Sequence, residues 1–188
     1  MKYVELKSQL KTKIEKTYLI TGDDRYLCYD ALKKIEDALQ ITIKDMNTVT
    51  ISGEQVSAKD VIDSANMYPF GDLYRLVIVK NFSPTKNKNE YQVIQNYAKH
   101  PLESTVLVFF NPDSADFFKG MSELTTIDCS KIDAKTISAF VKNVLAKNAI
   151  QSSEDAIDKL IMFCGSDMAR ITNELEKLTA YVFDTKVL

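Results

Sequence analysis

The sequence predicts an α/β protein with a parallel β-sheet covered by helices on both faces, followed by a small three-helix lid domain. Short apolar runs alternate with helical patterns as far as Asp128. Two of these runs, 76–79 and 106–110, are uninterrupted, which is typical of central strands in a parallel sheet. Beyond Asp128 only helical patterns follow. We therefore expect one domain at residues 1–130 and a second at 131–188.

The elements of the first domain follow from their apolar periodicity. Helices are expected where apolar residues repeat every three or four positions; one is expected to start at Asp23-Asp24, and Ser57 is a good N-cap for another. Strands are expected where apolar or β-branched residues run together. The expected helices are 3–12, 23–39, 58–65 and 90–99. The expected strands are 18–20, 47–51, 76–79, 105–110 and 125–128. A loop is expected at 81–89, and one or two helical turns at 113–119.

Three amphipathic helices are expected in the second domain. Asp133, Ser153 and Asp167 are suitable N-caps, and each precedes a stripe of apolar residues at helical spacing. Gly165 is expected to end the middle helix. The last six residues, FDTKVL, resemble the start of further structure, so we expect a truncated form of a longer protein.

Composition and charge exclude several classes of protein. The 188 residues carry a net charge of -2, whereas a protein that wraps nucleic acid by itself has a clear basic excess. Any DNA contact is therefore expected to be local or shared with partners. The charged N-terminus lacks an apolar signal region, and no stretch is long enough to span a membrane. A cytoplasmic protein without a membrane partner is expected.

Cysteine and histidine usage gives little support to a metal site or a nucleophilic enzyme. Cys28, Cys129 and Cys164 are far apart, and the first and last fall on apolar helical faces, which favours reduced thiols in a cytosolic core. No cysteine or histidine pair has zinc-ligand spacing. His100 is the only histidine, so a Ser-His-Asp or Cys-His mechanism would have to depend on it alone.

The turn after the first strand, Thr21-Gly22-Asp23-Asp24-Arg25, lies where many nucleotide-binding proteins hold a phosphate. An α/β domain followed by a helical domain resembles the layout of AAA+ ATPases. However, the chain has no G-x-x-x-x-G-K-[ST] motif, and two carboxylates occupy the phosphate position. These acids are better explained as a helix cap and first-turn acid. Strand 105–110 is followed by Asn-Pro-Asp, without an Asp-Glu pair for Mg²⁺. We expect no cofactor and no catalytic site.

Three weaker signals have ordinary structural explanations. Asp113 and Asp116 are explained as a helix start. Arg170 lies where some of these ATPases carry a phosphate-sensing arginine, but an i,i+4 pair with Glu174 is the favoured explanation. Three lysines make a locally basic loop, either simply solvated or in weak contact with phosphate: Lys80, Lys86 and Lys88.

A cluster of large apolar side chains precedes strand 76–79, in a segment that also contains turn-forming Pro and Gly. The cluster consists of Met67, Tyr68, Pro69, Phe70 and Leu73. One interpretation is a hydrophobic staple that closes helix 58–65 onto the sheet. The other is an exposed anchor that fills a pocket on a partner protein, since aromatic anchors contribute much of the energy of an interface. The residues alone favour the two interpretations equally.

The order of several segments is similar to one known family. The matching segments are YLITGDDRYL at 18–27, MYPF at 67–70, RLVIVKN at 75–81, TVLVF at 105–109, GSD at 165–167 and NELEKL at 173–178. In this order they resemble the delta subunit family of bacterial DNA polymerase III, the clamp-loader subunits that open the sliding clamp. The resemblance covers nearly the whole chain.

The resemblance implies an AAA+-like fold without a phosphate loop, in a non-catalytic subunit of a DNA polymerase (nucleotidyltransferase) holoenzyme. It implies that Met67, Pro69 and Phe70 bind the sliding clamp (the beta subunit), and we add Tyr68 and Leu73 on chemical grounds. This sequence departs from the family pattern after Pro69, where it reads FGDLY.

The resemblance also implies a C-terminal collar domain in family members, through which other clamp-loader subunits assemble, and we expect this domain to be absent here. Primer-template DNA is expected as a partner only within that complex. Two alternatives remain: an AAA+-type nucleotide-hydrolysing enzyme, and a DNA-binding adaptor with an AAA+-like body.

Overall fold

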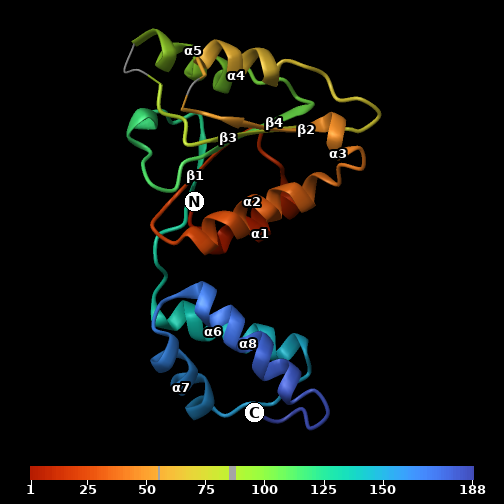
Figure 1. Cartoon of the computed structure of the whole chain (residues 1–188), viewed down its shortest axis with the longest axis vertical. Helices are drawn as coiled ribbons and strands as arrows, with labels where there is room; N and C mark the ends of the chain where they lie inside the picture. Colours follow the sequence, from red (N-terminus) through yellow and green to blue (C-terminus); the bar gives the residue numbers. More distant parts are fainter. Residues whose placement is uncertain (55, 85–87) are drawn as a thin grey trace. The chain divides into compact units, whose positions relative to one another are not determined.

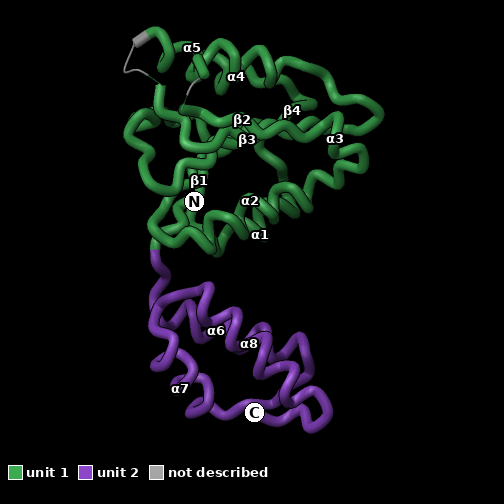
Figure 2. Tube along the Cα trace, in the orientation of Figure 1, with its two compact units in different colours: residues 1–130 green, residues 131–188 purple. Residues whose placement is uncertain are grey.

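The computed structural model describes residues 1–54, 56–84 and 88–188, and these form two compact units, residues 1–130 and 131–188 (Figure 2). Each unit has its own apolar core, in keeping with the change from mixed to purely helical patterns along the sequence.

Unit 1 is built on a five-stranded sheet in which every neighbouring pair is parallel, with the order β2-β3-β4-β1-β5. The strands are β1 (Thr17–Thr21), β2 (Thr48–Ser52), β3 (Arg75–Lys80), β4 (Thr105–Phe110) and β5 (Thr125–Asp128). The two uninterrupted apolar runs pair in register through Val77 and Leu107, and both strands are almost entirely buried. The predicted parallel sheet is confirmed.

Helices cover both faces of this sheet, as predicted (Figure 1). One face packs against α1 (Tyr3–Thr12) and α2 (Arg25–Leu39), and the other against α4 (Ala58–Ala65) and α5 (Lys88–Lys99). On the α4–α5 face, Phe82, Phe109 and Phe118 pack with ring centroids 4.8 to 6.2 Å apart. The predicted helical turns near 113–119 are one 3₁₀ turn at Asp116–Phe118.

Ser57 caps α4 as predicted and forms a capping box with Asp60. At the helix start predicted for Asp23-Asp24, Asp24 is the N-cap and its carboxylate accepts from the backbone N–H of Leu27 at 3.1 Å. The first-turn acid expected there is wrong, because α2 begins at Arg25 and both acids precede it. The short helix α3 (Lys44–Asn47) was not predicted, because four residues are too few to show a helical repeat. Its N-cap, Ile43, makes no side-chain cap hydrogen bond.

Unit 2 contains α6 (Ala134–Lys147), α7 (Glu154–Cys164) and α8 (Met168–Tyr181). The carboxylate or hydroxyl of each predicted N-cap residue accepts a backbone N–H: Asp133, Ser153 and Asp167. The predicted Arg170–Glu174 ion pair is wrong, because Glu174 pairs with Lys177 at 2.8 Å.

All three cysteines are free thiols with buried side chains, as predicted for Cys28 and Cys164. None of the helices within the described ranges is long and apolar enough to cross a membrane.

Candidate functional site

The predicted apolar cluster forms an exposed turn between α4 and β3; we call residues 67–73 the apolar turn. The sheet is parallel, so the turn lies at the edge where β2, β3 and β4 begin. The exposed fractions are 55% for Met67, 76% for Tyr68, 65% for Phe70 and 84% for Leu73, while Pro69 is half-buried. These side chains do not close α4 onto the core, as a staple would. Tyr74 is half-buried, with Lys16 Nζ 4.7 Å from its ring centroid.

The backbone of the apolar turn is held by Asn47, the last residue of α3. Its side-chain Oδ1 accepts from Phe70 N–H at 2.7 Å, and its Nδ2 donates to Phe70 O at 2.8 Å. The same Nδ2 donates to Asp72 Oδ2 at 2.8 Å. Asn47 itself is fully buried, so its side chain would lose these partners without access to water, which makes their loss costly.

Asp72 ties the other end of the turn to the segment before α3. Its carboxylate accepts from the hydroxyl and N–H of Thr42, at 2.6 and 3.2 Å, and from Ile43 N–H at 2.9 Å. These hydrogen bonds, led by the Thr42 hydroxyl, lower the pKa of Asp72 to about 2. Gly71 has a φ of +70°, where a side chain would be strained, and an added Cβ would lie 3.0 Å from Ile43 Cδ1.

A buried arginine lies beside the turn at the start of β3. Arg75 donates from Nη1 to Met46 O at 2.8 Å, and its Nη2 lies 3.8 Å from Met67 Sδ. Its Nε is buried without a hydrogen-bond partner. Thr105 Oγ1 also donates to Met67 O at 3.4 Å. The turn is therefore anchored from both α3 and the strand starts, which restricts its conformations.

The sequence did not indicate that three of these residues belong to the site: Asn47, Asp72 and Arg75. Asn47 precedes a β-branched run and was therefore predicted to start the strand. Arg75 was assigned only to the buried run RLVIVK and was given no role at the turn. Only spatial proximity shows that they meet at the turn. The structure also adds Met46 and Ile43, which are exposed apolar residues of the α3 segment.

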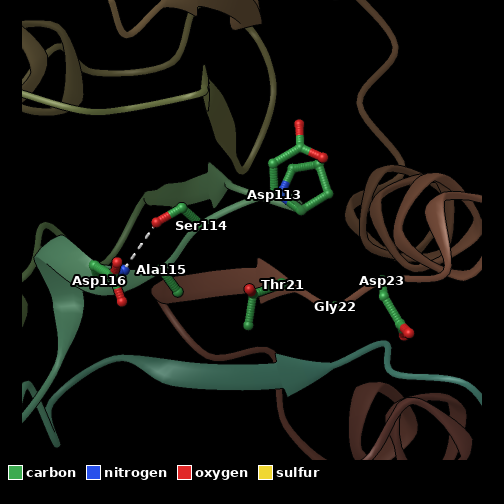
Figure 3. Close-up of a pocket in the computed structure, with 8 residues that line it drawn as sticks. Thr21, Gly22, Asp23, Asp113, Ser114, Ala115 and Asp116 are labelled. Carbon is green, nitrogen blue, oxygen red and sulfur yellow. Dashed lines mark hydrogen bonds between the residues drawn. The ribbon is translucent and has the colours of Figure 1, made fainter.

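The position of a phosphate loop lies at the opposite edge of the sheet, where β1 and β4 end (Figure 3). A pocket of about 480 Å³ is found there, lined by Thr21, Gly22, Asp23, Pro112, Asp113, Ser114, Ala115 and Asp116. Three of these residues carry carboxylates, and none carries a basic side chain. A triphosphate site is normally lined by backbone N–H groups and a basic side chain instead.

The backbone of this turn is already bonded within the protein. Asp24 N–H donates to Cys129 O at 3.2 Å, and Gly22 N–H donates to Pro112 O at 3.4 Å. Gly22 has a φ of +143°, and an added Cβ would lie 2.2 Å from the carbonyl carbon of Cys129. A phosphate cradle requires free N–H groups at this place, whereas these two point at carbonyl oxygens.

Side chains near the pocket are also paired. Arg25 Nη2 donates to both carboxylate oxygens of Asp113, at 2.7 and 2.8 Å. Asn111, after β4, donates to Phe82 O at 2.9 Å and accepts from Phe82 N–H at 3.1 Å, so its amide holds the strand ends together. Neither β3 nor β4 is followed by an Asp-Glu pair.

Two further predictions concern charged groups. Among the residues that the structure describes, no group of three Asp, Glu, His or Cys side chains could hold a metal ion. In the predicted basic loop, Lys80 is half-buried, whereas Lys86 and the side chain of Lys88 lie outside the described part of the chain. A phosphate contact by this loop stays a prediction.

Known proteins share this fold. A Bacillus subtilis DNA clamp loader delta protein is 22% identical, with a TM-score of 0.77, over 99% of this chain and 59% of that one. A DNA polymerase III gamma subunit-related protein of Thermotoga maritima is 14% identical, with a TM-score of 0.54, over 98% and 75%. The RuvB Holliday junction branch migration motor of the same organism is 11% identical, with a TM-score of 0.51, over 98% and 61%. The predicted AAA+-like fold is confirmed.

Sequence comparison gives the family. The DNA polymerase III subunit delta of Bacillus subtilis is 24% identical over 192 aligned positions, which include 95% of this chain. The chain spans 55% of the length of that relative. The sequence model of the family described as "DNA polymerase III, delta subunit" matches residues 18–140, well over half of the chain. The chain therefore belongs to the DNA polymerase III delta subunit family.

Proposed function

We propose that this chain binds the sliding clamp of DNA replication and helps to hold its ring open, without hydrolysing ATP itself. The observation that carries the proposal is the apolar turn, with Phe70 and Leu73 exposed on a backbone that Asn47 and Asp72 hold in place. Family membership supports a role within a clamp loader.

An exposed apolar turn is suited to docking into a pocket on a protein partner. Clustered large apolar side chains on a surface commonly mark an interaction site. Met67, Tyr68, Phe70 and Leu73 are exposed together, so a partner would desolvate all four. Ligands of open parallel sheets usually bind where the strands end, but this turn lies where they begin. Its position therefore favours a protein partner over a small substrate.

Clamp opening requires more than tight binding. A ligand with equal affinity for the closed and open rings shifts no equilibrium between them. The turn must therefore bind the open or strained ring more strongly. A turn of restricted conformation is suited to this task, because a flexible one would adapt to both forms of the ring.

The absence of ATP hydrolysis is supported by the contacts at the phosphate-loop position. The N–H groups of Gly22 and Asp24 are bonded to carbonyl oxygens, and Asp23, Asp113 and Asp116 line the adjacent pocket. These contacts disfavour the alternative of a nucleotide-hydrolysing enzyme. The net charge of -2 disfavours the alternative of a DNA-binding adaptor.

We propose the following partners and location. The sliding clamp binds the apolar turn, other clamp-loader subunits assemble through the collar domain that the family carries, and primer-template DNA is contacted only within the assembled complex. The setting is the cytoplasm, which the three reduced thiols support.

The proposal is tested by equilibrium binding between the full chain and the sliding clamp of the same organism, with and without ATP. We expect saturable binding that does not depend on ATP. The proposal would be contradicted if the chain shows no binding to the clamp, or if it binds ATP saturably at micromolar concentration.

A further inference from the structure

Asn47, at the end of the four-residue helix α3, makes the hydrogen bonds of a strand neighbour through its side chain. Its amide pairs with both the N–H and the carbonyl of Phe70, as a neighbouring strand would. Within the described part of the chain, the backbone hydrogen bonds of residues 68–73 are made to Asn47 alone. One side chain therefore replaces the backbone ladder that would otherwise fix this segment.

The same amide reaches a second anchoring group. Its Nδ2 also donates to Asp72, whose carboxylate holds Thr42 and Ile43. The segment before α3, the end of α3 and the apolar turn are thereby joined through two side chains. Met46 and Met67 are linked in turn through Arg75. The exposed apolar groups of α3 and of the turn thus belong to one supported surface.

We propose that Asn47 is a positioning residue, which holds the apolar turn in the shape that the sliding clamp binds. This inference rests on the proposed function. Asn47 is fully buried and makes no contact with the clamp itself. It acts through Phe70, by raising the fraction of molecules in which the turn already has its binding shape.

The expected effect follows from population arithmetic. The apparent dissociation constant equals the intrinsic one divided by the fraction of binding-competent molecules. If losing the Asn47 contacts leaves about one tenth of the molecules competent, the apparent affinity falls about tenfold. The loss appears mainly in the association rate, because the bound turn regains the same clamp contacts.

The variant Asn47→Asp gives a readout that a purely structural role would not. An ionised aspartate cannot donate to Phe70 O, and it would face the Asp72 carboxylate, which lies 2.8 Å from Asn47 Nδ2. Protonation restores one donor. Burial and the nearby carboxylates of Asp72 and Asp45 raise the pKa of the new carboxyl. The positive charges of Arg75, which donates to Met46 O, and of Lys44 on the same helix lower it. We expect clamp affinity about tenfold below wild type at pH 8, recovering towards wild type at pH 5.

A matched control is available at the opposite edge of the sheet. Asn111 is buried and holds both the N–H and the carbonyl of Phe82, as Asn47 holds those of Phe70. Asn111→Asp should lower the thermal stability but leave clamp affinity within about twofold of wild type at each pH. Asp72→Ala removes the second anchoring group at a half-buried site and should also slow association with the clamp. It is the test variant if Asn47→Asp does not fold.

The experiment measures association and dissociation of the full chain on immobilised clamp between pH 5 and pH 8. Slower association of Asn47→Asp at pH 8, with recovery at pH 5, supports the inference. If Phe70→Ala weakens binding while Asn47→Asp, or Asp72→Ala in its place, binds like wild type, this inference alone is overturned. If Phe70→Ala also binds like wild type, the proposed function falls with it.

Discussion

Replacing Met67 and Phe70 together by alanine should abolish most clamp binding while leaving the fold intact. Phe70 is 65% exposed and Met67 55%, so less than half of each side chain is buried in the free protein. Full burial of such a side chain stabilises by about 1.5–3 kcal/mol, so each truncation should cost the fold about 1 kcal/mol. Buried in a partner pocket, an anchor residue contributes ~2 kcal/mol or more, about 30-fold in affinity. The pair should weaken binding by up to about 1,000-fold, less if the two couple.

The assay is equilibrium binding to labelled clamp, with a thermal melt of each variant as a check of folding. Met162 and Phe163 in unit 2 provide a matched control, because they are the same residue types with exposed fractions of 74% and 69%. Their double alanine variant should bind the clamp within about twofold of wild type. The reasoning is refuted if Met67→Ala/Phe70→Ala binds like wild type or fails to fold.

Three further predictions concern the backbone, pH and nucleotide. Gly22→Ala should destabilise unit 1 by about 3 kcal/mol or more, because strain at positive φ adds to a clash with Cys129. Gly165→Ala should cost only about 1–2 kcal/mol of strain, because no atom lies within 4 Å of the added Cβ. Urea unfolding measures the loss of stability in both variants. The pKa of Asp72 is lowered on folding, so its stabilisation is fully present above its ordinary pKa and is lost as pH falls from about 4 to about 2. The difference in unfolding free energy between wild type and Asp72→Asn should therefore shrink over that range. A constant difference would contradict the assignment. ATP should show a Kd above about 1 mM in calorimetry, both for wild type and for Asp23→Ala, since the N–H groups of this turn are occupied in both; saturation below that concentration would contradict the geometry.

The layers of the fold could be predicted because local signals and burial agree. The runs that became β3 and β4 are apolar throughout, and only central strands of a parallel sheet require that pattern. The helix starts carry caps that act over three residues, so Asp133 and Ser153 could be assigned without tertiary information. Such contacts are local in sequence, and a sequence shows them directly.

The support of the candidate site could not be predicted, because it depends on long-range contacts. Asn47 and Phe70 are 23 residues apart, and nothing in the residues between them indicates the pairing. For the apolar turn, residue types alone did not distinguish a core role from a partner contact, since Met, Phe and Leu are equally suited to both. Phe70 and Leu73 are exposed in the folded chain, which excludes the core interpretation for these two residues, and contact with the clamp stays a proposal. Glu174 has two basic neighbours at helical spacing, Arg170 and Lys177, and it pairs with Lys177. The side-chain geometry that decides between them is not specified by the sequence.

The most direct test of the central claim compares the affinity of the full chain for two forms of the sliding clamp. One form is a ring covalently cross-linked across its subunit interfaces, and the other carries a weakened interface that opens readily. If the apolar turn favours the open ring, the chain should bind the weakened ring about tenfold or more tightly, and Met67→Ala/Phe70→Ala should remove the difference. Equal affinity for both rings would contradict the account, because such binding cannot shift the ring towards its open form.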